Sequence, residues 1–209
     1  VDRVDYANDT TNAVEKGYLA TPSLATSGAG NADYAYWAGG GPSPRVSTVQ
    51  RLDYASDTAA ATTKGPITNS LDYLRGTSNG VYGYIAGGYS PDKSTVDRID
   101  FNNDTATAST KGPLAAAAWG MGSTGTRSFG YYAGGDPGGT GSTVSRLDYS
   151  NDTAVASARA RLSLQTGKVN GVSSQANGLP GFNFSQGSVG TYSAGYFGGG
   201  GPSTKSSVE

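Results

Sequence analysis

The chain has 209 residues and a formal net charge of -1, with 33 glycines, 14 tyrosines, no histidine and no cysteine. A nearly neutral chain is a poor electrostatic partner for nucleic acid, and the absence of cysteine excludes disulfide bridges and thiolate chemistry. The chain offers no Ser-His-Asp triad, no imidazole ligand for a metal and no run of about eighteen apolar residues, so we expect no membrane-spanning helix.

Three sequence motifs, here called phrases, recur in the same order along the chain. The first begins at Val1, Val49, Val96 and Val144, with spacings of 48, 47 and 48 residues. The second begins at Lys16, Lys64, Lys111 and, in degenerate form, Arg159. The third is aromatic and ends at Gly40, Gly88, Gly135 and Gly200. The sequence is therefore a four-fold repeat with units 1–48, 49–95, 96–143 and 144–209.

Each unit is predicted to hold four short strands. It opens with alternating apolar and polar residues, as in Val96 to Phe101, followed by an Asn-Asp or Ser-Asp turn. A strand of small residues then forms a hairpin with the first and ends at Lys-Gly-Pro, because proline cannot donate a hydrogen bond. A third strand rich in glycine and alanine and a fourth, aromatic strand that ends in Gly-Gly complete the unit.

This order of phrases resembles the Kelch repeat over essentially the whole chain. The resemblance rests on the aromatic strand ending in Gly-Gly, then a variable loop, then a strand ending in Arg-x-Asp-Tyr and a polar turn. It implies an all-β fold, a Kelch-like β-propeller with four repeats of four short antiparallel strands, forming a single domain over 1–209. The tryptophan usual in Kelch repeats six residues after the strand-ending aspartate is replaced by Thr11, Ala59, Ala106 and Ala154. We therefore expect cores packed with smaller side chains.

The two ends of the chain are predicted to share one blade. The chain opens with the third and fourth strands of a blade and ends with the first and second, so an N-terminal hairpin would complete the last blade and remove the exposed edges. The alternative is that these residues are part of a longer propeller, or of a processed chain, since the sequence begins at Val1. The fourth unit is also longer: 36 residues separate Arg159 from Gly195, where the other units have 19, which places a 17-residue insertion near 165–188.

Most of the recurring charges are interpreted as structural. Paired carboxylates could indicate acid–base catalysis or a ring of metal sites, but a catalytic site needs one asymmetric group, whereas these residues occur in every unit. We expect them to cap turns and to pair arginine or lysine with aspartate. The structural set is Arg3, Asp5, Arg51, Asp53, Arg98, Asp100, Arg146 and Asp148, together with the turn residues Asp9, Asp57, Asp104 and Asp152.

Residues that break the repeat are the candidates for binding. Loops that join the second and third strands of each blade differ between units, and such loops gather at one end of a propeller. The insertion is the most apolar irregular stretch and could plug the propeller or contact a neighbouring protein. The candidate binding residues are Pro42, Arg45, Tyr89, Asp92, Lys93, Asp136, Leu179, Phe182 and Phe184.

Three functions are compatible with this sequence. The sequences of the repeats also resemble those of virion-associated proteins of marine bacteriophages. This resemblance implies a virion or extracellular location. It also implies a non-enzymatic module that binds other protein subunits or a host-surface glycan or protein. The alternatives are a lectin-like, carbohydrate-binding propeller and, less favoured, a glycosidase that uses carboxylates among Asp33, Asp72, Asp92 and Asp136. No cofactor or metal is expected, since the Asn-Asp turns lack the spacing of a calcium loop.

Overall fold

The computed structural model of the chain describes residues 1–209 except 9, 42–43, 90, 137–140, 174–194 and 199–209. Its regular elements are almost all short strands, and the fold is all-β, as predicted. The strands are β1 (Asp2–Arg3), β2 (Val14–Glu15), β3 (Ser27–Gly30), β4 (Tyr34–Ala38), β5 (Val49–Asp53), β6 (Thr62–Lys64), β7 (Arg75–Ser78), β8 (Tyr82–Ala86), β9 (Val96–Asp100), β10 (Ser109–Lys111), β11 (Gly122–Gly125), β12 (Phe129–Ala133), β13 (Thr143–Asp148), β14 (Ser157–Arg161), β15 (Asn170–Ser173) and β16 (Gly195–Gly198). Two 3₁₀ turns, η1 (Tyr54–Ser56) and η2 (Tyr149–Asn151), follow β5 and β13.

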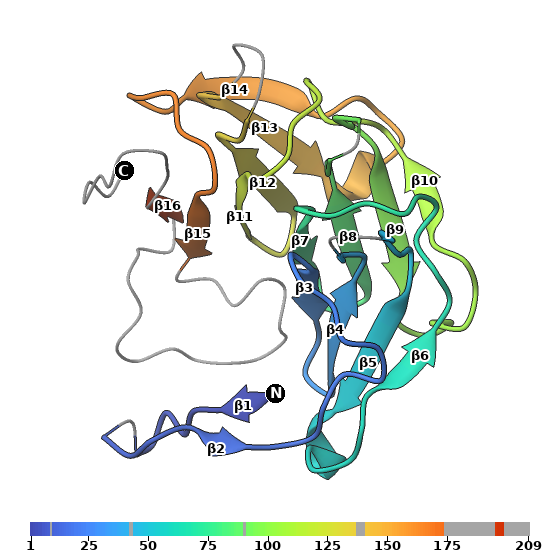
Figure 1. The fold of residues 1–209 in the computed structure, drawn as a ribbon. Helices are drawn as coiled ribbons and strands as arrows, with labels where there is room; N and C mark the ends of the chain where they lie inside the picture. The colour runs from blue at the N-terminus through green and yellow to red at the C-terminus, as the bar shows by residue number, and fades with distance from the viewer. Residues whose placement is uncertain (9, 42–43, 90, 137–140, 174–194, 199–209) are drawn as a thin grey trace.

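The strands form three antiparallel sheets of four strands and two sheets of two. The larger sheets have the orders β3-β4-β5-β6, β7-β8-β9-β10 and β11-β12-β13-β14, and the smaller ones are β1-β2 and β15-β16. In Figure 1 the sheets follow one another in a curved row, with β3, β7, β11 and β15 on its inner side. Among the described strands no sheet joins the two ends of the chain, so the shared blade predicted from the sequence is not formed here.

The sheets are out of phase with the repeat units. Each four-stranded sheet takes its first two strands from one unit and its last two from the next, so the junction of two units lies in the loop between the second and third strands. The backbone at Gly39, Gly87 and Gly134 enters these loops with φ of +66, +69 and +69°, which suits glycine. The Gly-Gly that ends the aromatic phrase is therefore needed where the chain leaves the second strand.

The position of the predicted insertion needs a correction. Residues from Gln165 to Ser173 follow the repeat, because β15 corresponds to β11 of the preceding unit. The extra residues fall after Ser173, between β15 and β16, where the equivalent β11-β12 connection is a tight turn. The sequence alone misplaced the start because glycine and serine occur on both sides of it.

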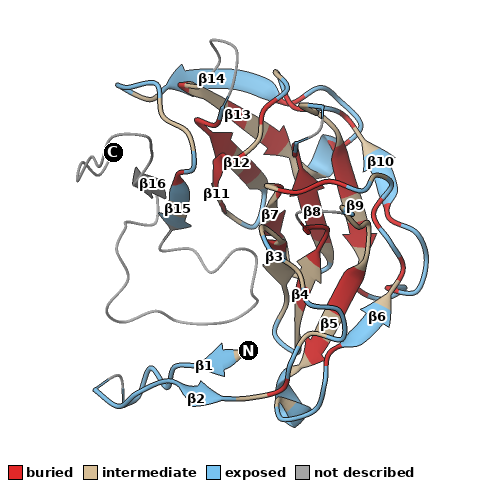
Figure 2. Ribbon diagram, in the orientation of Figure 1, coloured by how far each residue is buried: buried red, intermediate tan, exposed pale blue. Residues whose placement is uncertain are grey.

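The cores lie between neighbouring sheets. One cluster joins the first two large sheets and contains Tyr36 on β4 and Ile85 on β8. The second joins the next pair and contains Tyr84 on β8 with Tyr132 on β12. Figure 2 shows the buried residues concentrated on the central strands, whereas β1, β2 and β14 are exposed. Small side chains such as Ala86 are buried as expected, but the cores also contain the large rings of Tyr36, Tyr84 and Tyr132.

The inner strands approach each other so closely that side chains are excluded at some positions. A Cβ added to Gly76 on β7 would overlap the carbonyl oxygen of Gly28 on β3, which is backbone and cannot move aside cheaply. Gly28 is the equivalent residue of the preceding sheet, and a Cβ added there would meet nothing within 4 Å.

We therefore predict that the Gly76→Ala and Gly28→Ala variants differ sharply in stability, although both are glycine-to-alanine changes in equivalent strands. Gly76→Ala should lower the free energy of unfolding by about 2 kcal/mol, because it overpacks the contact between two sheets. Gly28→Ala should be neutral or slightly stabilising, because it restricts only the unfolded chain. Urea denaturation of both variants checks this, and equal stabilities would contradict the packing of β3 against β7.

Candidate functional site

The recurring aspartates have two structural roles. Those that end the third strand of a sheet accept a hydrogen bond from the backbone N–H two residues later, as Asp53 does from Ala55 at 2.9 Å. The same bond is made by Asp5, Asp100 and Asp148. Hydrogen bonds from Ser150 lower the pKa of the Asp148 carboxyl. These aspartates fix the turn after the strand, which is a role required in every repeat.

The second set of aspartates, here called the turn carboxylates, links each sheet to the one before it. Asp104 lies in the β9-β10 turn and is 7% exposed. It contacts Arg51 Nη1 at 2.7 Å and Lys64 Nζ at 3.2 Å, and accepts a hydrogen bond from the Tyr36 hydroxyl at 2.9 Å. All three partners belong to the preceding sheet, so the predicted pairing of charges occurs between sheets.

The next junction repeats this arrangement. Asp152 contacts Arg98 at 2.7 Å and Lys111 at 3.6 Å and accepts a hydrogen bond from Tyr84 at 3.1 Å. At the N-terminal junction Asp57 contacts Arg3 at 2.6 Å and Lys16 at 3.3 Å.

Burial and charge strengthen these junctions. Burial, followed by the neighbouring Asp104 carboxylate, holds the pKa of the Tyr36 hydroxyl well above its usual value, so it remains a hydrogen-bond donor. The Arg51 guanidinium also lies over the Tyr34 ring, 4.1 Å from its centroid. Arg98 and Arg146 lie in the same way over Tyr82 and Phe129. The aromatic ring and the turn carboxylate together thus restrict the rotamers of Arg51 and Arg98.

We predict that Asp104→Asn lowers the free energy of unfolding by about 3 kcal/mol, because it leaves Arg51 and Lys64 half-buried without their counter-ion. The matched control is Asp33→Asn, an exposed residue in the β3-β4 turn, which should change stability by less than about 0.5 kcal/mol. Thermal and urea unfolding measure both. Equal, small effects would show that the turn carboxylates do not hold the sheets together.

A different group of side chains gathers where the loops between second and third strands lie. It contains three aromatic rings in a row: Trp119 is 5.1 Å from Tyr73 and 5.2 Å from Tyr89 between ring centroids. The Arg45 guanidinium lies 5.2 Å from the Tyr89 centroid, and its Nε is 3.0 Å from a carboxylate oxygen of Asp72. Asp136 pairs with Trp119 through two backbone hydrogen bonds and is exposed. We call Arg45, Asp72, Tyr73, Tyr89, Trp119 and Asp136 the loop-end cluster.

The side chains of this cluster are not needed to build the scaffold. The backbone N–H of Gly41, Tyr89 and Asp136 donates in each case to the carbonyl of the equivalent residue in its own sheet. The acceptors are Leu24, Asp72 and Trp119. The same backbone hydrogen bond is thus made in all three sheets, although φ is +97° at Gly41 and lies outside the left-handed region at Tyr89 and Asp136. The side chains at the two positions change from glycine and leucine to tyrosine and aspartate and then to aspartate and tryptophan.

The backbone of Tyr73 has a strained conformation. Its φ is +54°, in the left-handed region, where a bulky residue is strained by about 1–2 kcal/mol. The equivalent residue of the next sheet is Gly120 at φ +63°, which adopts this conformation freely. Ala25 and Lys168 adopt the same conformation in the first and fourth units, at φ of +54 and +57°, so the strain is common to the non-glycine residues at this position and does not single out the tyrosine.

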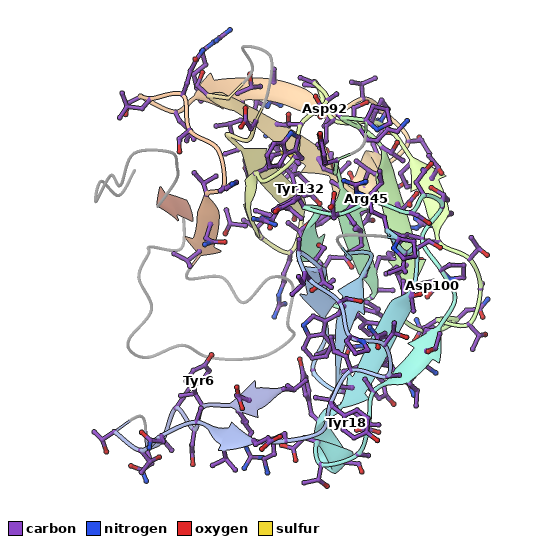
Figure 3. All side chains as sticks on the ribbon, in the orientation of Figure 1. Tyr6, Tyr18, Arg45, Asp92, Asp100 and Tyr132 are labelled. Carbon is purple, nitrogen blue, oxygen red and sulfur yellow. The ribbon has the colours of Figure 1, made fainter. Side chains whose placement is uncertain are left out.

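The structure brings together part of the set predicted from the sequence. Arg45, Tyr89 and Asp136 belong to the loop-end cluster, and Asp92 and Lys93 are half-buried on the loop that carries Tyr89. Figure 3 labels Arg45 and Asp92. Pro42, Leu179, Phe182 and Phe184 lie outside the described residues.

Sequence reasoning missed Tyr73 and Trp119. Both lie before an inner strand, in segments that were assigned to the glycine- and alanine-rich third strand of a unit. A signal was present, because aligning the four units places Tyr73 against Ala25, Gly120 and Lys168, and Trp119 against Leu24, Asp72 and Gly167. Only the fold shows that these departures lie beside the variable loops.

One of the four glycosidase candidates lies apart from the others. Asp33 is exposed in the β3-β4 turn, at the other end of the strands from Asp136, whereas Asp72 is buried and ion-paired with Arg45 in the loop-end cluster. The described part of the chain contains no group of three or more acidic, histidine or cysteine residues placed to hold a metal ion. It also contains no helix with the length and apolar character to cross a membrane.

A cavity of about 330 Å³ lies away from the loop-end cluster, at the far end of β3 and β4. Its walls are formed mainly by small residues of β3 and β7, with Trp37 and Tyr54 beside them. It contains no charged side chain, so its chemistry offers less specificity than the loop-end cluster.

No protein-family model matches this sequence, and no curated protein matches it either. The Kelch-like and phage-like resemblances therefore stay predictions.

Proposed function

We propose that the chain is a Kelch-like β-propeller of four blades, closed by its own ends, that acts as a non-enzymatic binding module through the loop-end cluster. The observation that carries the function is the asymmetry of this cluster: aromatic and charged side chains occupy positions that hold glycine, alanine or leucine in the first unit, although the same backbone hydrogen bonds are made there. The closed ring supplies the rigid scaffold on which these side chains are held.

The N-terminal hairpin supports closure, because it docks on the first large sheet as each large sheet docks on the next. Gly17 N–H donates to the Asp57 carbonyl at 2.7 Å, and Gly65 and Gly112 make the equivalent bonds at 2.8 Å. The charged contacts of Arg3 and Lys16 with Asp57 follow the same pattern. The β1-β2 hairpin thus stands where the outer two strands of a preceding sheet would stand.

The β15-β16 hairpin supplies the complementary half. The N–H of Tyr73 donates to the Ala25 carbonyl, that of Gly120 to Tyr73 and that of Val169 to Gly120, at 3.0, 3.0 and 3.2 Å. Left-handed backbone occurs at Ala25, Tyr73, Gly120 and Lys168, once before each inner strand. The β15-β16 hairpin therefore continues the row as the inner two strands of a fourth sheet.

Side chains of the N-terminal hairpin are left uncovered where closure would bury them. Tyr6 is 94% exposed, and Figure 3 shows it projecting from the hairpin, away from the four-stranded sheets. Its counterparts Phe101 and Tyr149 stack on tyrosines of the preceding sheets, with centroids 4.7 and 4.6 Å apart. Val4 is 49% exposed, whereas the equivalent Leu52 is 5% exposed.

The other side of the open junction is also incomplete. Tyr131 corresponds to the buried Tyr36 and Tyr84 but is half-buried. Arg146 corresponds to Arg51 and Arg98, yet in the described part of the chain it forms no ion pair with a turn carboxylate. By the pattern of the other junctions, closure places the Tyr6 ring on Tyr131.

We predict that Tyr6→Ser lowers the free energy of unfolding by about 2 kcal/mol, because in the closed ring it removes a stacked aromatic contact. Tyr18→Ser is the matched control, since Tyr18 is also exposed but has prolines, not stacking aromatics, as counterparts in the next two units. Urea denaturation of Tyr6→Ser, Tyr131→Ser and the double variant gives the coupling between the two rings.

An open ring gives the opposite result, because a side chain that is 94% exposed contributes little to stability. A Tyr6→Ser variant as stable as the Tyr18→Ser control would therefore refute closure. Sedimentation of the wild-type chain separates closure within one chain from exchange of hairpins between two copies, since only the second produces a dimer.

The non-enzymatic role is supported by residue chemistry. The chain lacks both histidine and cysteine, and its least exposed candidate carboxylate, Asp72, is engaged with Arg45. Differing loops on a constant scaffold are the usual arrangement of a recognition surface. Together with the resemblance to virion-associated phage repeats, this favours a virion appendage or adhesin-type module that contacts a host surface or another protein.

We predict that the labelled chain binds envelopes of marine bacteria and that reverting the cluster abolishes binding. The reverted variant, Tyr73→Ala with Tyr89→Gly and Trp119→Leu, takes its residues from the first unit, where Ala25, Gly41 and Leu24 occupy the equivalent positions. Pelleting of labelled protein with a panel of envelope preparations measures binding, with Tyr18→Ser as control. Equal retention of the reverted variant and the control would overturn the assignment of binding to this cluster.

A further inference from the structure

Three features of the loop-end cluster define the chemistry of its ligand. Its rings adjoin one another, since Trp119 lies between Tyr73 and Tyr89 at just over 5 Å from each, with its plane tilted by 57 and 50° to theirs. Tyr89 is 40% exposed, and Tyr73 and Trp119 are partly exposed, so these rings reach solvent. Aromatic rings that are wet on one side bind ligands with a flat apolar face.

The polar groups around the rings can serve a ligand that both donates and accepts hydrogen bonds. The Arg45 guanidinium is held in place by Asp72 and by the Tyr89 ring, and it carries only donors. The Asp136 carboxylate is exposed next to Trp119, and it carries only acceptors when ionised. A hydroxyl group can satisfy either of them with a single atom, whereas a peptide needs its carbonyl for the first and its N–H for the second.

We infer that the loop-end cluster is a binding site for neutral hexose glycans. This inference rests on the proposed function and names its ligand. The pyranose ring offers a C–H face to the aromatic surface and hydroxyl groups to Arg45 and Asp136. The cluster is confined to the junction of three sheets, so it presents a single site in spite of the four-fold repeat.

Charge selects neutral sugars over acidic ones. The cluster and the loop beside it contain three carboxylates, Asp72, Asp92 and Asp136, and two cations, Arg45 and Lys93, while a third cation, Lys168, lies against Gly120 beside Trp119. The Arg45 guanidinium is already neutralised by Asp72 at 3.0 Å, so it has little charge left for a sialic or uronic acid. An organic cation is also disfavoured, because Arg45 itself occupies one side of the Tyr89 ring.

The test is a printed array of neutral, amino and acidic oligosaccharides probed with the labelled wild-type chain, the reverted variant and the Tyr18→Ser control. We expect wild type and control to bind neutral hexose glycans, and the reverted variant to lose at least about tenfold in affinity for the strongest ligand by calorimetry. If the triple variant does not fold, Tyr89→Gly alone replaces it, since that side chain is the most exposed of the three.

Three results overturn the inference: no neutral glycan bound, acidic glycans bound more tightly than neutral ones, or unchanged affinity in the reverted variant. Bacterial envelopes separate this failure from failure of the proposed function. Binding that periodate oxidation of the envelopes abolishes supports a glycan. Binding that survives periodate, is lost after protease treatment and still depends on the cluster identifies a protein ligand, which refutes the glycan and leaves the binding module standing.

Discussion

The structure depends on one interaction, the turn carboxylate of each sheet held by an arginine, a lysine and, at two junctions, a tyrosine of the sheet before it. Asp104 and Asp152 sit in nearly identical surroundings, so the geometry is set by the repeat. A buried carboxylate without its cations would lower the free energy of unfolding, so any other placement of the two sheets is disfavoured. The interaction therefore specifies how neighbouring sheets are placed as well as stabilising them. Each sheet is thereby positioned by its predecessor, and the curved row of sheets follows.

This dependence explains why the ends of the chain matter. A hairpin of two strands is marginal on its own, and its free edges invite pairing with other chains. The N-terminal hairpin is docked through Asp57 on one side, while Tyr6 and Val4 remain uncovered on the other. One feature makes the open junction differ from the rest: Ala160 stands where Gly17, Gly65 and Gly112 pack against backbone of the next sheet. A junction at that position could not repeat the close backbone contacts of the other three in full.

In a repeat protein, residues with a structural role can be distinguished from candidate functional residues by comparing the units. Residues present in every unit, such as Arg51 and Asp53, are explained by turns and junctions. Residues that differ between units at equivalent positions are not, and Tyr73, Tyr89 and Trp119 are the largest of these.

The sequence by itself determined the number of units, the all-β character, the order of strands and the structural role of the repeated charges, because period and turn chemistry are local properties of the chain. It pointed to Arg45, Tyr89 and Asp136 because they lie in loops that differ. Only the tertiary structure decided that Arg51 meets Asp104 of the next sheet, and that Tyr73 and Trp119 join the loop residues in one cluster. These are contacts between residues about fifty positions apart, and a repeat in sequence fixes what each unit contains without fixing how neighbouring units touch.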